Sequence, residues 1–219
     1  ITFRNEHGKI IRNKDRKKIV QLEKFPVPLQ SVEELENLNQ SDSLLFHFPS
    51  FRGKKLKIAP LISSRGCNGN CSFCCNRAYW GKQRYVHLEF LKSQLDYYYT
   101  KGIIFFDVYD DNFTENKELI YEFTKYILDN KIDVHWWCSS RVDSVDVELL
   151  RKMKQAGCFM ISYGVESGSQ LILNNINKGV KIENIVKAGE LAKQVGLDFR
   201  VTISIGHVGE SIKTIQETI

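Results

Sequence analysis

Three cysteines at spacings of four and three, Cys67, Cys71 and Cys74, stand in a loop rich in glycine and asparagine, and Cys75 follows directly. These are four of the six cysteines in the chain. Thiols gathered so closely serve one of three purposes in proteins: a disulfide, a zinc site or an iron–sulfur cluster. The rest of the sequence bears on which of these applies.

A disulfide is the weakest interpretation of the cysteine loop. The N-terminus is polar and contains no apolar segment of a signal peptide, so we expect a cytoplasmic protein, in which disulfides are rare. Bridges between cysteines this close would also be strained. Zinc needs four ligands, usually as two pairs set well apart, and the chain has no second Cys-x-x-Cys.

An iron–sulfur cluster fits the spacing better. Three thiolates can hold three corners of a cubane cluster and leave one iron without a protein ligand. An open coordination position is what a catalytic centre needs, whereas a structural metal site is closed. Gly66 and Gly69 allow the backbone to turn tightly around such a cluster.

The elements that must position this loop form a repeating pattern. Short apolar segments alternate with amphipathic helical segments, and the predicted strands cover residues 56–62, 103–109, 133–138, 159–165 and 198–205. Near-continuous apolar strands joined by helices are typical of a parallel sheet. We therefore predict an α/β fold, a partial (β/α) TIM-like barrel with about five of six βα units present. A doubly wound open sheet is the alternative.

Polar or glycine residues follow each predicted strand. In parallel α/β folds the carboxyl ends of the strands lie together and carry the site. The candidates at these ends are Asp110, Asp111, Ser140, Arg141, Glu166 and Gly206. We expect them to converge with the cysteine loop on one face of the sheet.

The N-terminal quarter differs in charge from the rest of the chain. The formal net charge is +5, and residues 1–57 hold 12 Lys/Arg against 7 Asp/Glu, while residues 58–219 hold 19 of each. We predict that residues 1–56 are a connector, with a hairpin around Gly8 and a helix over residues 31–39, and that residues 57–219 are the core domain. The basic patch lacks interleaved aromatic residues, so nucleic acid is not the expected partner. No apolar run is long enough to span a membrane.

The sequence resembles the radical S-adenosylmethionine (SAM) superfamily. Cys-x-x-x-Cys-x-Phe-Cys, with Phe73 before the third cysteine, is similar to the signature of that family. Later segments resemble its strand-end motifs in the same order: Asp110-Asp-Asn-Phe-Thr114, Ser140-Arg-Val-Asp143, Tyr163-Gly-Val-Glu-Ser-Gly-Ser-Gln170 with Asn177-Lys-Gly179, and Ile205-Gly-His-Val-Gly-Glu-Ser211. Ser64-Arg-Gly-Cys67 resembles the subgroup that usually pairs this core with a cobalamin-binding domain.

The resemblance implies a mechanism and a set of partners. Cys67, Cys71 and Cys74 would hold a [4Fe–4S] cluster whose fourth iron chelates SAM, and an electron from the cluster would cleave SAM to a 5′-deoxyadenosyl radical. A small-molecule substrate and an electron donor such as flavodoxin or ferredoxin would complete the reaction.

The resemblance also implies which residues bind SAM. Acceptors near Asp110 would take hydrogen bonds from the ammonium group, and Arg141, beside Ser140, would pair with the carboxylate. Glu166 would accept the ribose hydroxyls. Phe73 and the backbone near Gly206 would bracket the adenine.

Structural roles compete with several of these assignments. Asp110 could cap the following helix or hold its own loop, and Arg141 could pair with Asp143 or Asp111. His207 stands where the family usually has a leucine followed by proline, and we interpret it as an exposed loop residue.

The other three cysteines, Cys75, Cys138 and Cys158, are expected to be buried small side chains. Trp136 and Trp137 should face opposite sides of their strand.

The cobalamin-binding signature Asp-x-His-x-x-Gly is absent from the chain. Asp133-Val-His135 begins it, but Cys138 stands where glycine is required. The chain begins at Ile1 and stops within a helical pattern, so we expect it to belong to a longer polypeptide whose cobalamin domain lies outside it.

The expected enzyme is a cobalamin-type radical methyltransferase or ring-forming oxidoreductase. The alternatives are a radical methylthiotransferase acting on RNA or protein, and a non-catalytic zinc-binding or interaction module.

Overall fold

The computed structural model describes residues 2–15, 17–19, 21–24 and 56–219. Its centre is a five-stranded parallel sheet with the order β3-β6-β7-β8-β9. The strands are β3 (Ile58–Leu61), β6 (Phe105–Val108), β7 (His135–Ser140), β8 (Cys158–Glu166) and β9 (Asp198–Ile203). Within this sheet the order of the strands in space follows their order along the chain, as in the wall of a barrel. In a doubly wound sheet the strand order reverses at one point. The partial barrel is confirmed, and the sheet stays open across the described residues.

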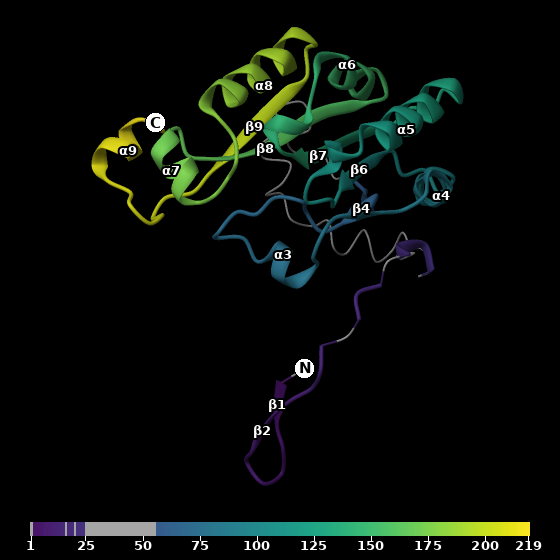
Figure 1. Ribbon diagram of the computed structural model, residues 1–219. Helices are drawn as coiled ribbons and strands as arrows, with labels where there is room; N and C mark the ends of the chain where they lie inside the picture. The colour runs from purple at the N-terminus through teal and green to yellow at the C-terminus, as the bar shows by residue number, and fades with distance from the viewer. Residues whose placement is uncertain (1, 16, 20, 25–55) are drawn as a thin grey trace.

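The helices that connect these strands cover one face of the sheet (Figure 1). The long ones are α4 (Leu88–Tyr99), α5 (Lys117–Asp129), α6 (Val147–Gln155) and α8 (Ile182–Gln194). The short helical elements are η1 (Leu22–Lys24), α3 (Asn76–Tyr79), η3 (Phe113–Glu115), η4 (Val142–Ser144), α7 (Gln170–Asn175) and α9 (Ile212–Gln216). Two small antiparallel pairs complete the described elements: β1 (Thr2–Arg4) with β2 (Ile10–Arg12), and β4 (Ser64–Arg65) with β5 (Arg84–Tyr85).

Alternation along the strands divides the apolar residues into two clusters. Phe106, Trp136 and Ile161 belong to the large core that packs under the helices. Trp137 and Met160 belong to a smaller cluster, and alternation places it on the opposite face. The prediction that the two tryptophans face opposite sides is confirmed, and both are buried.

Two helices begin at side-chain caps that hold the loops after the strands. The Asn116 side chain accepts a hydrogen bond from the backbone N–H of Leu119 at the start of α5. Asp146 does the same for Leu149 at the start of α6. Such caps satisfy donors that the first helical turn leaves free. The two caps fix the residue at which each loop ends and its helix begins, and therefore the positions of the polar residues in those loops.

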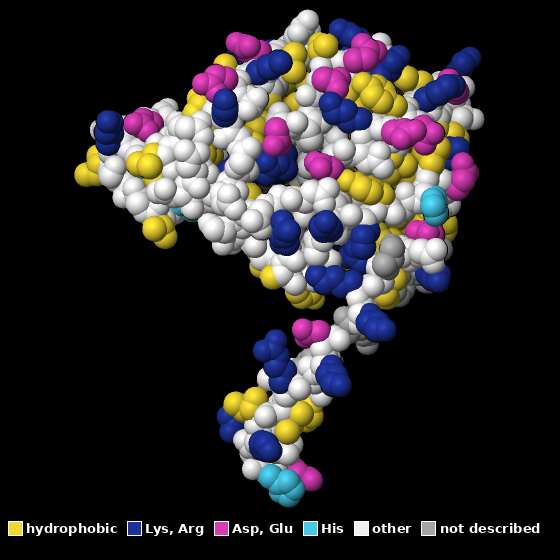
Figure 2. Space-filling model, in the orientation of Figure 1, with side chains coloured by type: hydrophobic (Ala, Val, Ile, Leu, Met, Phe, Trp, Pro, Cys, Tyr) yellow, Lys and Arg dark blue, Asp and Glu magenta, His cyan; other side chains and the backbone are white. Residues whose placement is uncertain are grey.

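The hairpin predicted around Gly8 is confirmed, and it stands away from the sheet (Figure 1). Several Lys and Arg side chains lie along this N-terminal extension (Figure 2). The helix predicted over residues 31–39 lies outside the described residues. No helix in the described ranges has the length and apolar character needed to cross a membrane.

Two sequence predictions, one about the bounds of a strand and one about the burial of a cysteine, need correction. The strand predicted over residues 133–138 begins at His135 and runs to Ser140, because its pairing with β6 starts at Phe105 and His135. Cys75 is exposed and not buried, because it lies in the cysteine loop ahead of α3 and not on a strand. Cys138 and Cys158, which do lie on strands, are buried as predicted.

Candidate active site

A cavity of about 200 Å³ lies between the cysteine loop and the carboxyl ends of β7, β8 and β9. The loop side is formed by Cys67, Cys71, Phe73, Cys74 and Asn76. The opposite side is formed by Asp111, Ser139, Ser140, Arg141, Ser162, Gly164, Glu166, Lys178 and Thr202. The structure therefore brings the three predicted ligand cysteines to one cavity with Phe73, Ser140, Arg141 and Glu166. Asp110 and Gly206 do not line it.

The three cysteines line the cavity, and backbone N–H groups point at the sulfurs of two of them. Cys67 and Cys71 are half-buried and Cys74 is exposed. The N–H of Gly69 points at the Cys67 sulfur at 3.3 Å, and the N–H of Asn76 points at the Cys74 sulfur at 3.5 Å. Burial raises the pKa of the Cys67 thiol, against the lowering effects of the Gly69 N–H and the Arg141 charge. Donors aimed at sulfur stabilise thiolates.

The donor set suits a cluster held by three separate cysteines. Within the described ranges, no three Cys, His, Asp or Glu side chains gather closely enough to hold one metal ion. All three cysteines instead line one cavity. A cubane cluster held by three cysteines needs its ligand sulfurs around one space, because each of them binds a different iron.

Two glycines are required for the path of the loop. A Cβ atom at Gly69 would stand 3.1 Å from Arg141 Nη1 and 3.3 Å from Cys67 Sγ. Gly66 has φ of +93°, and a Cβ there would stand 2.9 Å from the Gly81 carbonyl oxygen. Gly66 therefore stands in a turn that disfavours any side chain, and at Gly69 a side chain would require Arg141 or Cys67 to move by a few tenths of an ångström. The tight turn predicted at Gly66 is confirmed.

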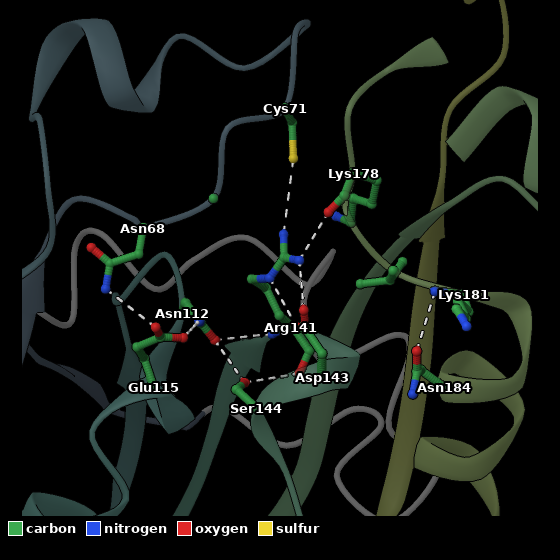
Figure 3. A network of polar contacts seen from close by, with 12 residues as sticks. Asn68, Cys71, Asn112, Glu115, Arg141, Asp143, Ser144, Lys178, Lys181 and Asn184 are labelled. Carbon is green, nitrogen blue, oxygen red and sulfur yellow. Dashed lines mark hydrogen bonds and ion pairs between the residues drawn. The ribbon is translucent and has the colours of Figure 1, made fainter. Parts of the chain in front are cut away.

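Arg141 connects three loops around the cavity (Figure 3). It forms a bidentate pair with Asp143, at 2.9 Å from Nε and 2.7 Å from Nη2. Nη2 also donates to the Lys178 carbonyl at 2.9 Å, and Nη1 points at Cys71 Sγ at 4.0 Å. Burial lowers the pKa of Arg141, but Asp143, Cys71 and Cys67 together raise it above its usual value, so the guanidinium stays charged. The structural role considered for Arg141, pairing with Asp143, is confirmed.

The turn between α7 and α8 holds the cysteine loop from the other side. The Ser72 N–H donates to the Ile176 carbonyl at 2.8 Å. The Asn177 side chain donates to the Asn70 carbonyl at 3.0 Å, across 107 positions of sequence. This turn, residues 176–178, also supplies the carbonyl that Arg141 contacts. We call it the anchor turn.

Asp110 is buried away from the cavity. It accepts hydrogen bonds from the Ser63 N–H at 2.9 Å, from the Ser64 hydroxyl at 2.6 Å and from the Ser63 hydroxyl. Burial raises its pKa, and the serine hydrogen bonds oppose that shift. The neighbouring Asp111 lines the cavity instead. The contacts of Asp110 are those of a residue that holds the start of the cysteine loop, the structural role considered for it.

Glu166 forms an ion pair with Lys178. The Lys178 ammonium lies 3.1 Å from Glu166 Oε1, and the two side chains are 6% and 14% exposed respectively. The Ser204 hydroxyl lies 3.2 Å from the other carboxylate oxygen. Glu166 has φ of +71°, a left-handed conformation that costs energy for a side chain with a Cβ. Sequence reasoning missed Lys178, although the Asn177-Lys178-Gly179 motif contains it, because no spacing shows which partner a lysine meets.

Phe73 packs against a residue of the last loop. Its ring centre lies 5.3 Å from that of His207, and the His207 Nε2 lies 2.6 Å from the Ser204 hydroxyl. His207 is half-buried, so the expectation of an exposed histidine is wrong, because Phe73 and Ser204 cover it. Gly206 is exposed, and its N–H donates to Glu210.

Comparison with known proteins places this site in a family context. The chain is 27% identical to an uncharacterized methyltransferase of Pyrococcus horikoshii over 216 residues, which cover 98% of this chain and 44% of that protein. It is 27% identical over 158 residues to an anaerobic magnesium-protoporphyrin IX monomethyl ester cyclase of Rubrivivax gelatinosus, covering 71% of this chain and 28% of that protein. The chain thus spans less than half the length of these two relatives.

Solved structures share the fold. The cobalamin-dependent SAM radical enzyme OxsB, with aqua-cobalamin and SAM bound, aligns with a TM-score of 0.73 at 20% identity, covering 99% of this chain and 31% of that one. The radical SAM methyltransferase TsrM of Kitasatospora setae, with cobalamin and a [4Fe–4S] cluster bound, aligns with a TM-score of 0.66 at 16% identity, covering 73% and 33%. The family model described as the Radical SAM superfamily matches residues 61–219. With its three cysteines on one cavity at the carboxyl edge of a partial barrel, the chain belongs to the radical SAM superfamily.

Proposed function

We propose that this chain is the core of a cobalamin-dependent radical SAM methyltransferase or oxidoreductase. In this proposal Cys67, Cys71 and Cys74 hold a [4Fe–4S] cluster, and residues 57–219 form the core that follows a connector, residues 1–56. The observation that carries the proposal is the meeting of these three cysteines with Arg141 on one cavity at the strand ends. Because the chain belongs to the radical SAM superfamily, we assign cluster binding and SAM cleavage to that cavity.

The cluster, when bound, supplies the electron that cleaves SAM to a 5′-deoxyadenosyl radical. The chain's own residues position and enclose it. Gly66 and Gly69 let the loop close, and backbone N–H groups stabilise the sulfurs of Cys67 and Cys74. The Arg141 guanidinium lies 4.0 Å from Cys71 Sγ and donates toward it, so it would help to orient this ligand.

The SAM contacts predicted from the sequence are retained as proposals, with one change of role. Arg141 and Ser140 would meet the carboxylate, and Glu166 would accept the ribose hydroxyls. Phe73 and the turn at Gly206 would bracket the adenine. Asp110 would act indirectly, because its carboxylate is committed to Ser63 and Ser64.

The association with cobalamin rests on relatives and not on a motif in this chain. The relative that aligns over 98% of the chain is named a methyltransferase, and the structure that aligns over 99% of it is a cobalamin-dependent radical enzyme. A radical methylthiotransferase has less support, because the putative methylthiotransferase among the relatives aligns over 68% of the chain. The proposed partners are a small-molecule substrate and an electron donor such as flavodoxin or ferredoxin.

Anaerobic reconstitution of the protein with iron and sulfide tests this proposal. We expect about four irons per chain and a reduced EPR spectrum that shifts when SAM is added, as an open iron site requires. Cys71→Ala should lose most of the iron, whereas Cys75→Ala, the adjacent exposed thiol, should retain both the iron and the shift. Iron that binds without a SAM-dependent shift, or equal iron in the two variants, would refute the proposal.

A further inference from the structure

The face of the sheet opposite the helices carries polar residues in successive layers beneath the cavity. In the upper layer Gly164 pairs with Thr202, and both line the cavity. In the next layer Ser139 pairs with Ser162, and Ser162 pairs with Arg200. Side chains two residues apart on a strand share a face. Arg200 therefore lies on the cavity side of β9, directly below Thr202.

One hydrogen bond, from Nε, holds the Arg200 side chain and leaves both terminal nitrogens of the guanidinium available. Its Nε donates to the Ser162 hydroxyl at 3.0 Å, and Ser162 is 4% exposed. Among the described residues, neither terminal nitrogen of Arg200 forms a hydrogen bond or ion pair. The guanidinium is half-buried. It therefore presents two parallel N–H groups on the inner face, oriented by a buried serine.

Asp107 stands on the same inner face, one layer lower on β6. It pairs in register with Trp137, which pairs with Met160, and Met160 pairs with Asp198 at the start of β9. The two residues between Asp107 and Asp198 in this layer are therefore apolar. Burial raises the pKa of Asp107 to about 7, and the charge of Arg200 acts in the opposite direction. Within the described part of the chain no hydrogen bond or ion pair reaches this carboxyl group. Asp107 as a whole is half-buried.

Arg200 and Asp107, two groups of opposite charge, thus lie on the same face of the sheet as the cavity, and no ion pair joins them within the described residues. We infer that Arg200 and Asp107 form the polar end of a substrate site beneath the cofactor cavity, in which the two terminal N–H groups of Arg200 bind an oxyanion of the substrate, either a carboxylate or a phosphoryl group. Planar bidentate recognition of such groups is what arginine does best. This inference deepens the proposed function and rests on it.

Calorimetric titration of the reconstituted protein with two probes, benzoate and inorganic phosphate, tests the inference. The wild-type protein should bind at least one probe, and the preferred probe distinguishes a carboxylate from a phosphoryl substrate. Arg200→Gln should weaken that binding by about tenfold or more, because hydrogen bonds to charged groups are the strong ones. Arg200→Lys, which keeps the charge but loses the fork, should recover part of the affinity. Arg151→Gln, an arginine on α6 that pairs with Glu148, is the control and should bind like wild type.

The iron content and the SAM-dependent EPR shift are measured on the same samples. Wild-type protein that binds neither probe, or equal binding by wild type and Arg200→Gln, overturns the inference while a normal EPR shift leaves the proposed function standing. Loss of probe binding in Arg200→Gln with unchanged iron and unchanged EPR shift supports the inference. Far-ultraviolet circular dichroism of each variant confirms that the fold is retained.

Discussion

Replacing Asp107 by asparagine should stabilise the protein at alkaline pH and hardly at all at acidic pH. Asparagine keeps the size of the side chain and removes the ionisation. The carboxyl group has a pKa of about 7 in the fold against an ordinary value of 3.8, chiefly because burial disfavours its charged form. A folded pKa that is raised means that the stability contribution is complete below the unfolded value and is lost as pH rises toward the folded value.

The magnitude follows from the two pKa values. A shift of about 3 units corresponds to roughly 4 kcal/mol of lost stability once Asp107 is ionised in both states, taken as an upper value. The loss accumulates between about pH 4 and about pH 7, with a slope of about 1.4 kcal/mol per pH unit. Between about pH 5.5 and about pH 8.5 the advantage of Asp107→Asn should grow by about 2 kcal/mol.

The assay is urea unfolding of wild type and Asp107→Asn at several pH values, with the difference in unfolding free energy plotted against pH. The difference cancels the titrations that both proteins share. Two neighbours act on this titration: the charge of Arg200 lowers the pKa of Asp107, and the pKa of Tyr109 is raised above its usual value by burial and by Asp107 itself. A difference that does not change with pH would refute the burial of this carboxyl group.

Two further substitutions test the site. Gly69→Ala should reduce the iron bound on reconstitution severalfold with little effect on the secondary structure, because the added Cβ meets Arg141 and Cys67 at 3.1 and 3.3 Å; iron content equal to wild type would contradict the close approach. Lys178→Met should lower the unfolding free energy by about 3 kcal/mol, because it leaves Glu166 buried without its partner. Adding Glu166→Gln to Lys178→Met should recover much of that loss in urea unfolding, and a purely additive double variant would argue against the pair.

The strands and the cysteine loop could be recognised in the sequence because their signals are local. A run such as residues 103–109 is apolar whatever surrounds it, and the spacing of Cys67, Cys71 and Cys74 is visible in one loop. The start of β7 was misplaced because it depends on where β6 pairs, which is a contact between segments. Element boundaries of this kind are set by tertiary register and not by composition.

The residues that surround the ligands were harder to assign for the same reason. A strand-end aspartate can face the cavity or the helices, and only the fold shows that Asp110 turns to Ser63 and Ser64 while Asp111 lines the cavity. Lys178 meets Glu166 across a turn and a helix, and Arg200 meets Ser162 across 38 positions. Side-chain pairs between distant segments produce no periodic pattern of residue types, so a single sequence does not reveal them.

The anchor turn has a consequence for the order in which the cluster loop matures. Ser72 and Asn70 are held by Ile176 and Asn177, so the ligands leave the ribosome roughly a hundred residues before the segment that fixes their loop. Contacts of such long sequence separation form late, because the chain between their ends must be closed first. During synthesis the three thiols are therefore present before their loop has its final shape. Stable iron–sulfur insertion should follow the folding of β8 and α7, which makes cofactor loading a late step in the biogenesis of this domain.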